Sequence, residues 1–106
     1  MIYYIQELNY NKKGNTKVSV SNVWEPYRDL NYAIENVRAF LGYQAKKNAK
    51  VKAKGEFVAI RNEKGDLVRA LQLYEGKVEI VSVYSIQDFV DYIVDMNEYI
   101  INEITE

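Results

Sequence analysis

Residues 57–84 read FVAIRNEKGDLVRALQLYEGKVEIVSVY, and this stretch decides the fold of the chain. Three apolar-rich segments, at residues 57–61, 67–74 and 77–84, are separated by short polar gaps that each contain a glycine. Gaps of this length with glycine are typical of tight turns between antiparallel strands. The stretch therefore predicts a three-stranded β-meander.

Another pair of strands is predicted nearer the start of the chain. Apolar and polar side chains alternate between residues 2 and 10, and the alternation resumes from Val18 to Trp24. The residues between them are rich in asparagine, lysine and glycine, which favour turns. We therefore expect residues 2–24 to form a β-hairpin. Trp24 is interpreted as a core or cap residue where this hairpin joins the next element, rather than as a binding platform.

Two segments change to a helical period. Apolar residues recur every three to four positions from Leu30 to Leu41, and Asp29, immediately before them, is a candidate N-cap. This pattern predicts a helix over residues 30–45. The last apolar stripe begins at Ile86 and runs to Ile104, which predicts a second, C-terminal helix.

The start of the second helix carries the clearest boundary signal in the chain. Ser85-Ile86-Gln87-Asp88 resembles a capping box, in which a serine side chain accepts a bond from the third helical N–H. Tyr84 and Phe89 occupy the positions of a hydrophobic staple. Asn97 interrupts the apolar stripe, and we expect it to cap a strand end rather than to meet its mate across a dimer interface.

The order of elements is therefore β-β-α-β-β-β-α, in one domain that spans residues 1–106. Strands joined by short turns form antiparallel sheets, and one-sided helices must cover a sheet face. We expect an α+β fold of two layers, with a five-stranded, mostly antiparallel sheet and both helices packed mainly on one face. The pattern leaves the strand order open.

The composition excludes several classes of function. The chain contains no cysteine and no histidine, which removes disulfides, thiol catalysis, the commonest general base and the commonest metal ligand. Its glycines lack the spacing of a phosphate-binding loop. The acidic residues of the last helix, Asp88, Asp91, Asp95 and Glu98, are interpreted as a solvated helix face. We expect a protein that is not an enzyme and binds no metal or cofactor.

The sequence also predicts where the protein acts. It begins MIYYIQELNY, without the features of a signal peptide, and no apolar run approaches the roughly 18 residues that cross a membrane. We therefore expect a soluble, cytoplasmic protein that does not contact membranes. Its wealth of Asn, Lys, Tyr and Ile is typical of AT-rich bacterial genomes, and indicates an accessory protein of a phage or other mobile element.

Charge is distributed unevenly along the chain. Residues 1–54 hold ten Lys and Arg against four Asp and Glu, a net charge of +6, whereas residues 55–106 hold four against eleven, a net charge of −7. A dipole of this kind can orient an encounter with a charged partner. It argues against a mimic of DNA, which would be acidic throughout.

A basic segment follows the first predicted helix. Its lysines, together with a later arginine, are candidates for contacts with a phosphate backbone: Lys46, Lys47, Lys50, Lys52, Lys54 and Arg61. Tyr43 and Phe57 flank the segment and have rings on which bases can stack. The other interpretation is an exposed edge strand whose alternating lysines prevent aggregation.

The chain also holds ten tyrosines, a residue that suits surfaces with an apolar body and a polar tip. Tyr32 and Tyr43 on the first helix point away from its apolar stripe, as do Tyr92 and Tyr99, beside Asp95, on the last helix. Outward aromatic side chains are typical of interfaces. The alternative is that the two helices pack side by side and bury these rings between them.

Two functions follow from these features. The first is a small non-enzymatic regulator or inhibitor that docks on a larger protein, or on a second copy of itself, through the outward tyrosines and the charge dipole. The alternative is a nucleic-acid-binding module that uses the basic segment. A small ligand held between sheet and helices is a third hypothesis.

Overall fold

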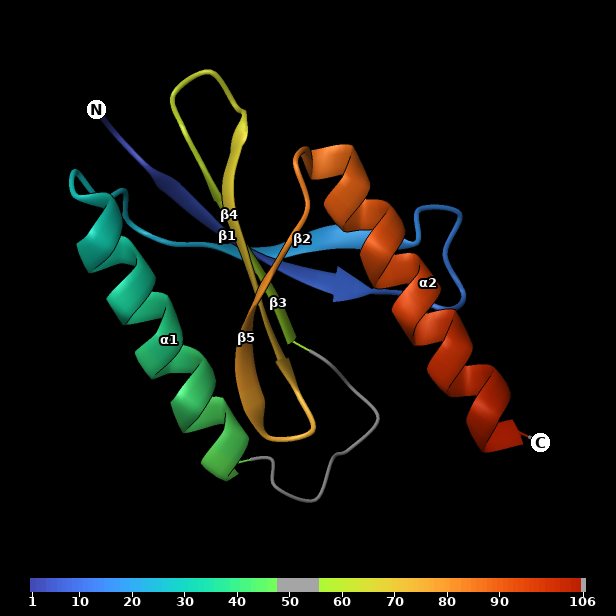
Figure 1. The fold of residues 1–106 in the computed structure, drawn as a ribbon. Coiled ribbons are helices and arrows are strands. Elements are labelled where there is room, and N and C mark those ends of the chain that lie inside the picture. The colour runs from blue at the N-terminus through green and yellow to red at the C-terminus, as the bar shows by residue number, and fades with distance from the viewer. Residues whose placement is uncertain (48–55, 106) are drawn as a thin grey trace.

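A computed structural model describes residues 1–47 and 56–105, with side chains as far as residue 98. Five strands and two helices follow one another in the predicted order (Figure 1). The elements are β1 (Tyr4–Tyr10), β2 (Val18–Val23), α1 (Leu30–Lys47), β3 (Glu56–Arg61), β4 (Leu67–Tyr74), β5 (Lys77–Val81) and α2 (Ile86–Thr105). The α+β fold class and the five-stranded sheet with two helices are thereby confirmed.

The sheet is antiparallel between all neighbours, in the order β2-β1-β3-β4-β5. The pairs β1–β2, β3–β4 and β4–β5 are the predicted hairpins, and Gly65 and Gly76 adopt positive φ angles of 84° and 77° in the last two turns. The pairing of β1 with β3 joins the two halves of the sheet and sets Glu7 opposite Val58. Strand β1 therefore lies inside the sheet, and α1 crosses over from β2 to β3.

The two helices lie on opposite faces of the sheet (Figure 1). Helix α1 packs over Ile5, Val58, Ile60, Leu71 and Leu73, whereas α2 packs over Leu8, Phe57, Ala59, Ala70 and Val81. The expectation of two layers, with both helices mainly on one face, is therefore wrong. Neighbouring residues of β3 and β4 point to opposite faces and are buried on both, so each face needs a helical cover.

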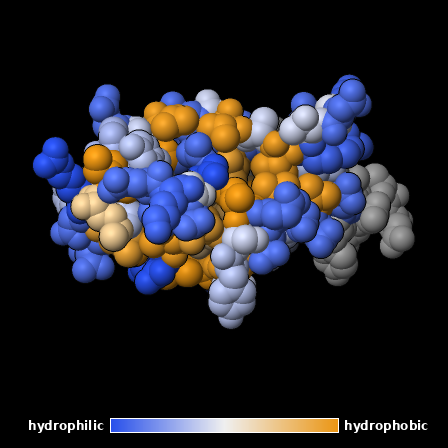
Figure 2. Space-filling view, turned by 90° about the horizontal axis from the view of Figure 1, so that it is seen from above, coloured by the Kyte–Doolittle hydropathy of each residue, from blue (hydrophilic) through white to orange (hydrophobic). Residues whose placement is uncertain are grey.

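Seen from above, apolar residues are gathered toward the middle of the molecule, with hydrophilic residues over much of the two sides (Figure 2). This distribution follows from three layers, in which each helix turns one side to the sheet and the other to solvent.

Both helices begin at the predicted caps. Asp29 Oδ1 accepts the N–H of Asn31 at 3.0 Å, and Ser85 Oγ accepts the N–H of Asp88 at 3.0 Å. The staple predicted for α2 is absent, because Tyr84 is 90% exposed while Phe89 is fully buried. Phe89 packs instead on Phe57 of the sheet, with ring centroids 6.2 Å apart.

Asn97 is buried within the apolar stripe of α2, as the sequence indicates. Its side-chain amide donates to the carbonyl of Ile93, one turn earlier in the same helix, at 2.8 Å. The expectation that it caps a strand end is wrong, because the helix backbone itself supplies a partner within reach.

Candidate functional site

The side of α1 that faces away from the sheet carries two exposed tyrosines. Tyr32 and Tyr43 are about three helical turns apart and therefore lie on the same side of the helix. They are 56% and 64% exposed, whereas the core-facing Val37 and Leu41 are fully buried. Ala39, also exposed, lies between the two tyrosines. We call this surface, with its neighbouring charged residues Glu35, Arg38, Lys46 and Lys47, the α1 outer surface.

The first tyrosine of this surface is held in place from below. Tyr27 contacts the Tyr32 ring edge-to-face, with centroids 5.6 Å apart. Tyr27 is itself fixed by two backbone hydrogen bonds to Tyr3, of 2.7 and 2.9 Å, just before β1. The Tyr32 ring is thus exposed to solvent but held in place by Tyr27. Binding of a partner would therefore cost little conformational entropy at this side chain.

The α1 outer surface is basic. Helix α1 carries Arg38, Lys46 and Lys47 against Glu35, a net charge of three minus one, or +2, and all four side chains are exposed. The two lysines lie in the last turn, where the helix dipole favours positive charge. Aromatic rings beside arginine and lysine suit an acidic partner surface.

Tyr92 does not face outward. It is partly buried against the α2 side of the core, stacks on Phe89 at 6.4 Å and donates its hydroxyl to Gln72 Oε1 in β4 at 2.7 Å. Burial is the main reason that the pKa of Tyr92 lies above its usual value. The expectation of an outward Tyr92 is wrong because its place on the flank of α2 is within reach of the sheet.

The remaining members of the tyrosine set do not join the α1 outer surface. Asp95 is exposed on α2, which lies on the other face of the sheet. Tyr99 lies in α2, and its side chain is outside the described residues. Because the helices are separated by the sheet, the two do not bury tyrosines between them, and Tyr32 and Tyr43 form a site separate from Asp95.

The structure also divides the basic segment. Lys46 and Lys47 are exposed at the end of α1, and Lys50, Lys52 and Lys54 lie outside the described residues. Arg61 ends β3, roughly 17 Å along the strand from Glu56. Its guanidinium donates to the Gly65 carbonyl at 2.8 Å and to Gln6 Oε1 at 3.2 Å. Arg61 therefore holds the β3–β4 turn and is set apart from the lysines.

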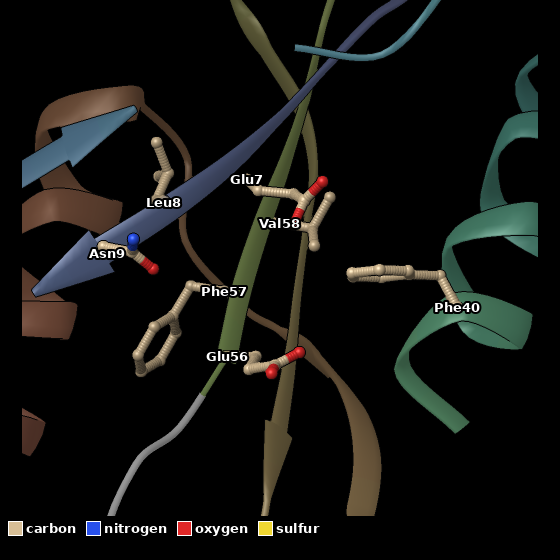
Figure 3. A pocket seen from close by; sticks show the side chains of 7 residues that line it. All are labelled: Glu7, Leu8, Asn9, Phe40, Glu56, Phe57 and Val58. Carbon is tan, nitrogen blue, oxygen red and sulfur yellow. The ribbon is translucent and has the colours of Figure 1, made fainter. Parts of the chain in front are cut away.

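A small pocket of about 70 Å³ lies where β1 and β3 meet α1 (Figure 3). Glu7 and Glu56 project toward Phe40 of α1 from neighbouring strands. Sequence reasoning did not single out this pair, because pairing of β1 with β3 brings together residues from distant parts of the chain. To predict that Glu7 lies near Glu56, one needs to know how β1 and β3 are paired, and the hydrophobic pattern does not determine this pairing.

One carboxylate of the pocket organises its surroundings. Glu7 Oε2 accepts the Trp24 indole N–H at 2.6 Å and the Asn22 side-chain amide at 2.8 Å. Trp24 also contacts Phe40 edge-to-face, with centroids 5.2 Å apart. This arrangement confirms Trp24 as a packing residue at the joint between the hairpin and α1.

The other carboxylate is the less favourably placed of the two. Burial raises the pKa of Glu56, the negative charge of Glu7 raises it further, and Lys47 acts in the opposite direction. The pocket therefore favours positive charge beside it, which Lys47 supplies from the end of α1. Glu7 thus holds Trp24 beside Phe40 of α1, whereas Glu56 lies in a less favourable environment for its charge.

Among the side chains that the structure describes, in residues 1–47 and 56–98, no group of three or more Asp and Glu is arranged to hold a metal ion. None of the helices, over the residues described, has the length and apolar character to cross a membrane. Comparison with known proteins gives no matching family model, no matching curated protein and no matching solved structure.

Proposed function

We propose that this protein is a non-enzymatic binding module that docks on an acidic surface of a larger protein through the α1 outer surface. The observation that carries the proposal is the exposure of Tyr32 and Tyr43, at 56% and 64%, on one side of one helix. Tyrosine is enriched among the residues that dominate binding energy at interfaces. The exposed cations of α1 supply the complementary charge.

The regulator or inhibitor role is the form of this function that the sequence suggests. The α1 outer surface offers aromatic area and fixed positive charge, groups that bind rather than react. Docking through it would leave the opposite side of the molecule, with α2 and its exposed Asp91 and Asp95, free of the partner. A small domain that covers a partner surface in this way would act by blocking it.

The test is a comparison of two variants in affinity capture from the lysate of a low-GC bacterium. Tyr32→Ala/Tyr43→Ala removes both rings. Tyr84→Ala is the matched control, because Tyr84 is 90% exposed and lies between β5 and α2 rather than on α1. We expect the double variant to bind the captured protein at least about 30-fold more weakly, as for hot-spot residues. Tyr84→Ala should bind like the wild type.

Stability must be measured on the same variants. Both tyrosines are exposed, so the double variant should unfold within about 0.5 kcal/mol per substitution of the wild type. Unchanged affinity in a folded double variant would refute the proposal. A large loss of stability would show that the rings belong to the core.

The second candidate function is nucleic-acid binding. Lys46 and Lys47 are exposed one turn after the exposed Tyr43, so cations and a stacking ring lie together. This proposal expects affinity for DNA or RNA to fall roughly tenfold or more between low and moderate salt. Capture that disappears after nuclease treatment would favour it over a protein partner. Binding that is absent, or insensitive to salt, would count against it.

A further inference from the structure

The two edges of the sheet differ in charge. Strand β5 ends the sheet on one side and carries Lys77 and Glu79. Strand β2 ends it on the other side with the sequence VSVSNV, which has no charged residue. Charged side chains, lysine above all, protect edge strands from pairing with another chain. The β2 edge lacks this protection.

The β2 edge also exposes apolar side chains. Val20 and Val23 are 48% and 54% exposed. They pair with Leu8 and Gln6 of β1, so both valines lie on the α2 face of the sheet. Apolar side chains in this position are suited to cross-strand contacts with a further strand.

We propose that β2 pairs antiparallel with β2 of a second copy of this chain, which joins the two sheets across a two-fold axis. In such a pairing the start of one strand lies beside the end of the other. Val18 can then meet Val23 of the second copy on the same face of the joined sheet. Each contact occurs twice, as a closed two-fold interface requires.

Charges beyond the ends of β2 favour this occupant. Lys12 and Lys13 are exposed in the turn before β2, and Glu25 is exposed just after its end. Antiparallel pairing brings the lysines of one copy toward the Glu25 side chain of the other, at both ends of the interface. Parallel pairing would set lysine beside lysine. Charge complementarity therefore selects a second copy in the antiparallel orientation.

A bulge limits the strength of this contact. Ser21 is the extra residue of β2 opposite Glu7 and Leu8, and its hydroxyl donates to the Glu7 carbonyl at 3.2 Å. Bulges increase the local twist of an edge, so the regular pairing is short. We therefore expect a reversible dimer whose population rises with protein concentration.

The first test measures mass by sedimentation over a wide concentration range. The wild type should rise from 12.4 kDa toward twice that mass. Val20→Lys should stay monomeric at concentrations where the wild type is mostly dimeric. Ile80→Lys is the matched control, because Ile80 is similarly exposed, at 47%, on the opposite edge, and it should dimerise as the wild type does.

Three results would overturn the proposal: a wild type that stays monomeric at millimolar concentration, a folded Val20→Lys that dimerises like the wild type, or a dimer lost in Ile80→Lys. Circular dichroism establishes that each variant is folded. Tyr32→Ala/Tyr43→Ala should dimerise normally, so failure of this interface and failure of the α1 docking surface are separate results.

The absence of cysteine from the chain allows a second test. Ser21→Cys places a unique thiol near the middle of β2, and Glu79→Cys places one on the β5 edge. A short bismaleimide should cross-link the first variant into a dimer and leave the second monomeric. Equal cross-linking of the two variants would contradict pairing through β2.

Discussion

The two helices cover the same sheet from opposite faces, yet their solvent-facing sides differ. Helix α1 turns Tyr32 and Tyr43 outward among cations, while α2 turns Asp91 and Asp95 outward and holds Tyr92 against the sheet. Over the described residues, the outer side of α1 is therefore basic and that of α2 is acidic. The tyrosines are exposed to solvent on α1, whereas Tyr92 of α2 packs against the sheet.

The position of each tyrosine around its helix determines whether it is exposed or packed on the sheet. Tyr32 and Tyr43 lie about 140° around α1 from its core-facing stripe, where no sheet strand is within reach. Tyr92 lies on the flank of α2, and the sheet extends far enough beneath it to offer Gln72 as a partner. Whether a tyrosine is exposed therefore depends both on its angle from the apolar stripe and on how far the sheet extends beneath the helix.

The largest effect is expected at the centre of the α2 side. Phe89 is fully buried and contacts Phe57, so Phe89→Ala should reduce the free energy of unfolding by about 3–5 kcal/mol. Urea denaturation followed by circular dichroism measures this loss. A cost below about 1 kcal/mol would show that α2 contributes little to the core, and that α1 alone holds the sheet.

A smaller effect separates the two kinds of tyrosine. Tyr92→Phe keeps the ring and removes the hydroxyl that donates to Gln72, which is itself 5% exposed. We expect a cost of about 1 kcal/mol, because a buried acceptor loses its donor. Tyr43→Phe is the matched control on α1 and should change the stability by less than about 0.5 kcal/mol. Equal costs would contradict the division between the packed Tyr92 and the exposed Tyr43.

The hairpins, both helices and the α2 cap could be predicted from local patterns, since turns, periodicity and caps act over a few residues. The opposite placement of the helices had a signal in the sequence that was missed. Phe57-Val58-Ala59-Ile60 is apolar without alternation, which indicates a strand buried on both faces. A strand covered on one face would alternate.

Other features depend on tertiary register and have no local signal. The contact between Tyr92 and Gln72 requires the placement of α2 on the sheet, and the approach of Glu7 to Glu56 requires the pairing of β1 with β3. Helical periodicity predicted the outward positions of Tyr32 and Tyr43, which lie nearly opposite the apolar stripe, but was not sufficient for Tyr92, which lies on the flank of its helix.

The smallest effect concerns the pocket between α1 and the sheet. Two carboxylates line this pocket, whereas Phe89 of α2 packs on the other face of the sheet against apolar residues. Burial, and then the charge of Glu7, raise the pKa of Glu56 above its ordinary value of 4.5. Between that value and the raised pKa, the folded protein binds more protons than the unfolded chain, so stability falls as the pH rises through this window. At neutral pH the ionised Glu56 is therefore a small penalty.

Glu56→Gln removes this penalty while it keeps the shape of the side chain. We expect the variant to be more stable than the wild type at neutral pH by at most about 0.5 kcal/mol, since solvent screens a partly exposed carboxylate. The difference should shrink as the pH falls toward 4.5 and below, as thermal unfolding at a series of pH values would show. In a Glu7→Gln background the gain should be smaller, because the neighbouring charge is gone. Two outcomes would contradict this prediction: a variant less stable than the wild type at neutral pH, or a gain in stability that grows on acidification. Either would mean that the pocket stabilises the charged form of Glu56.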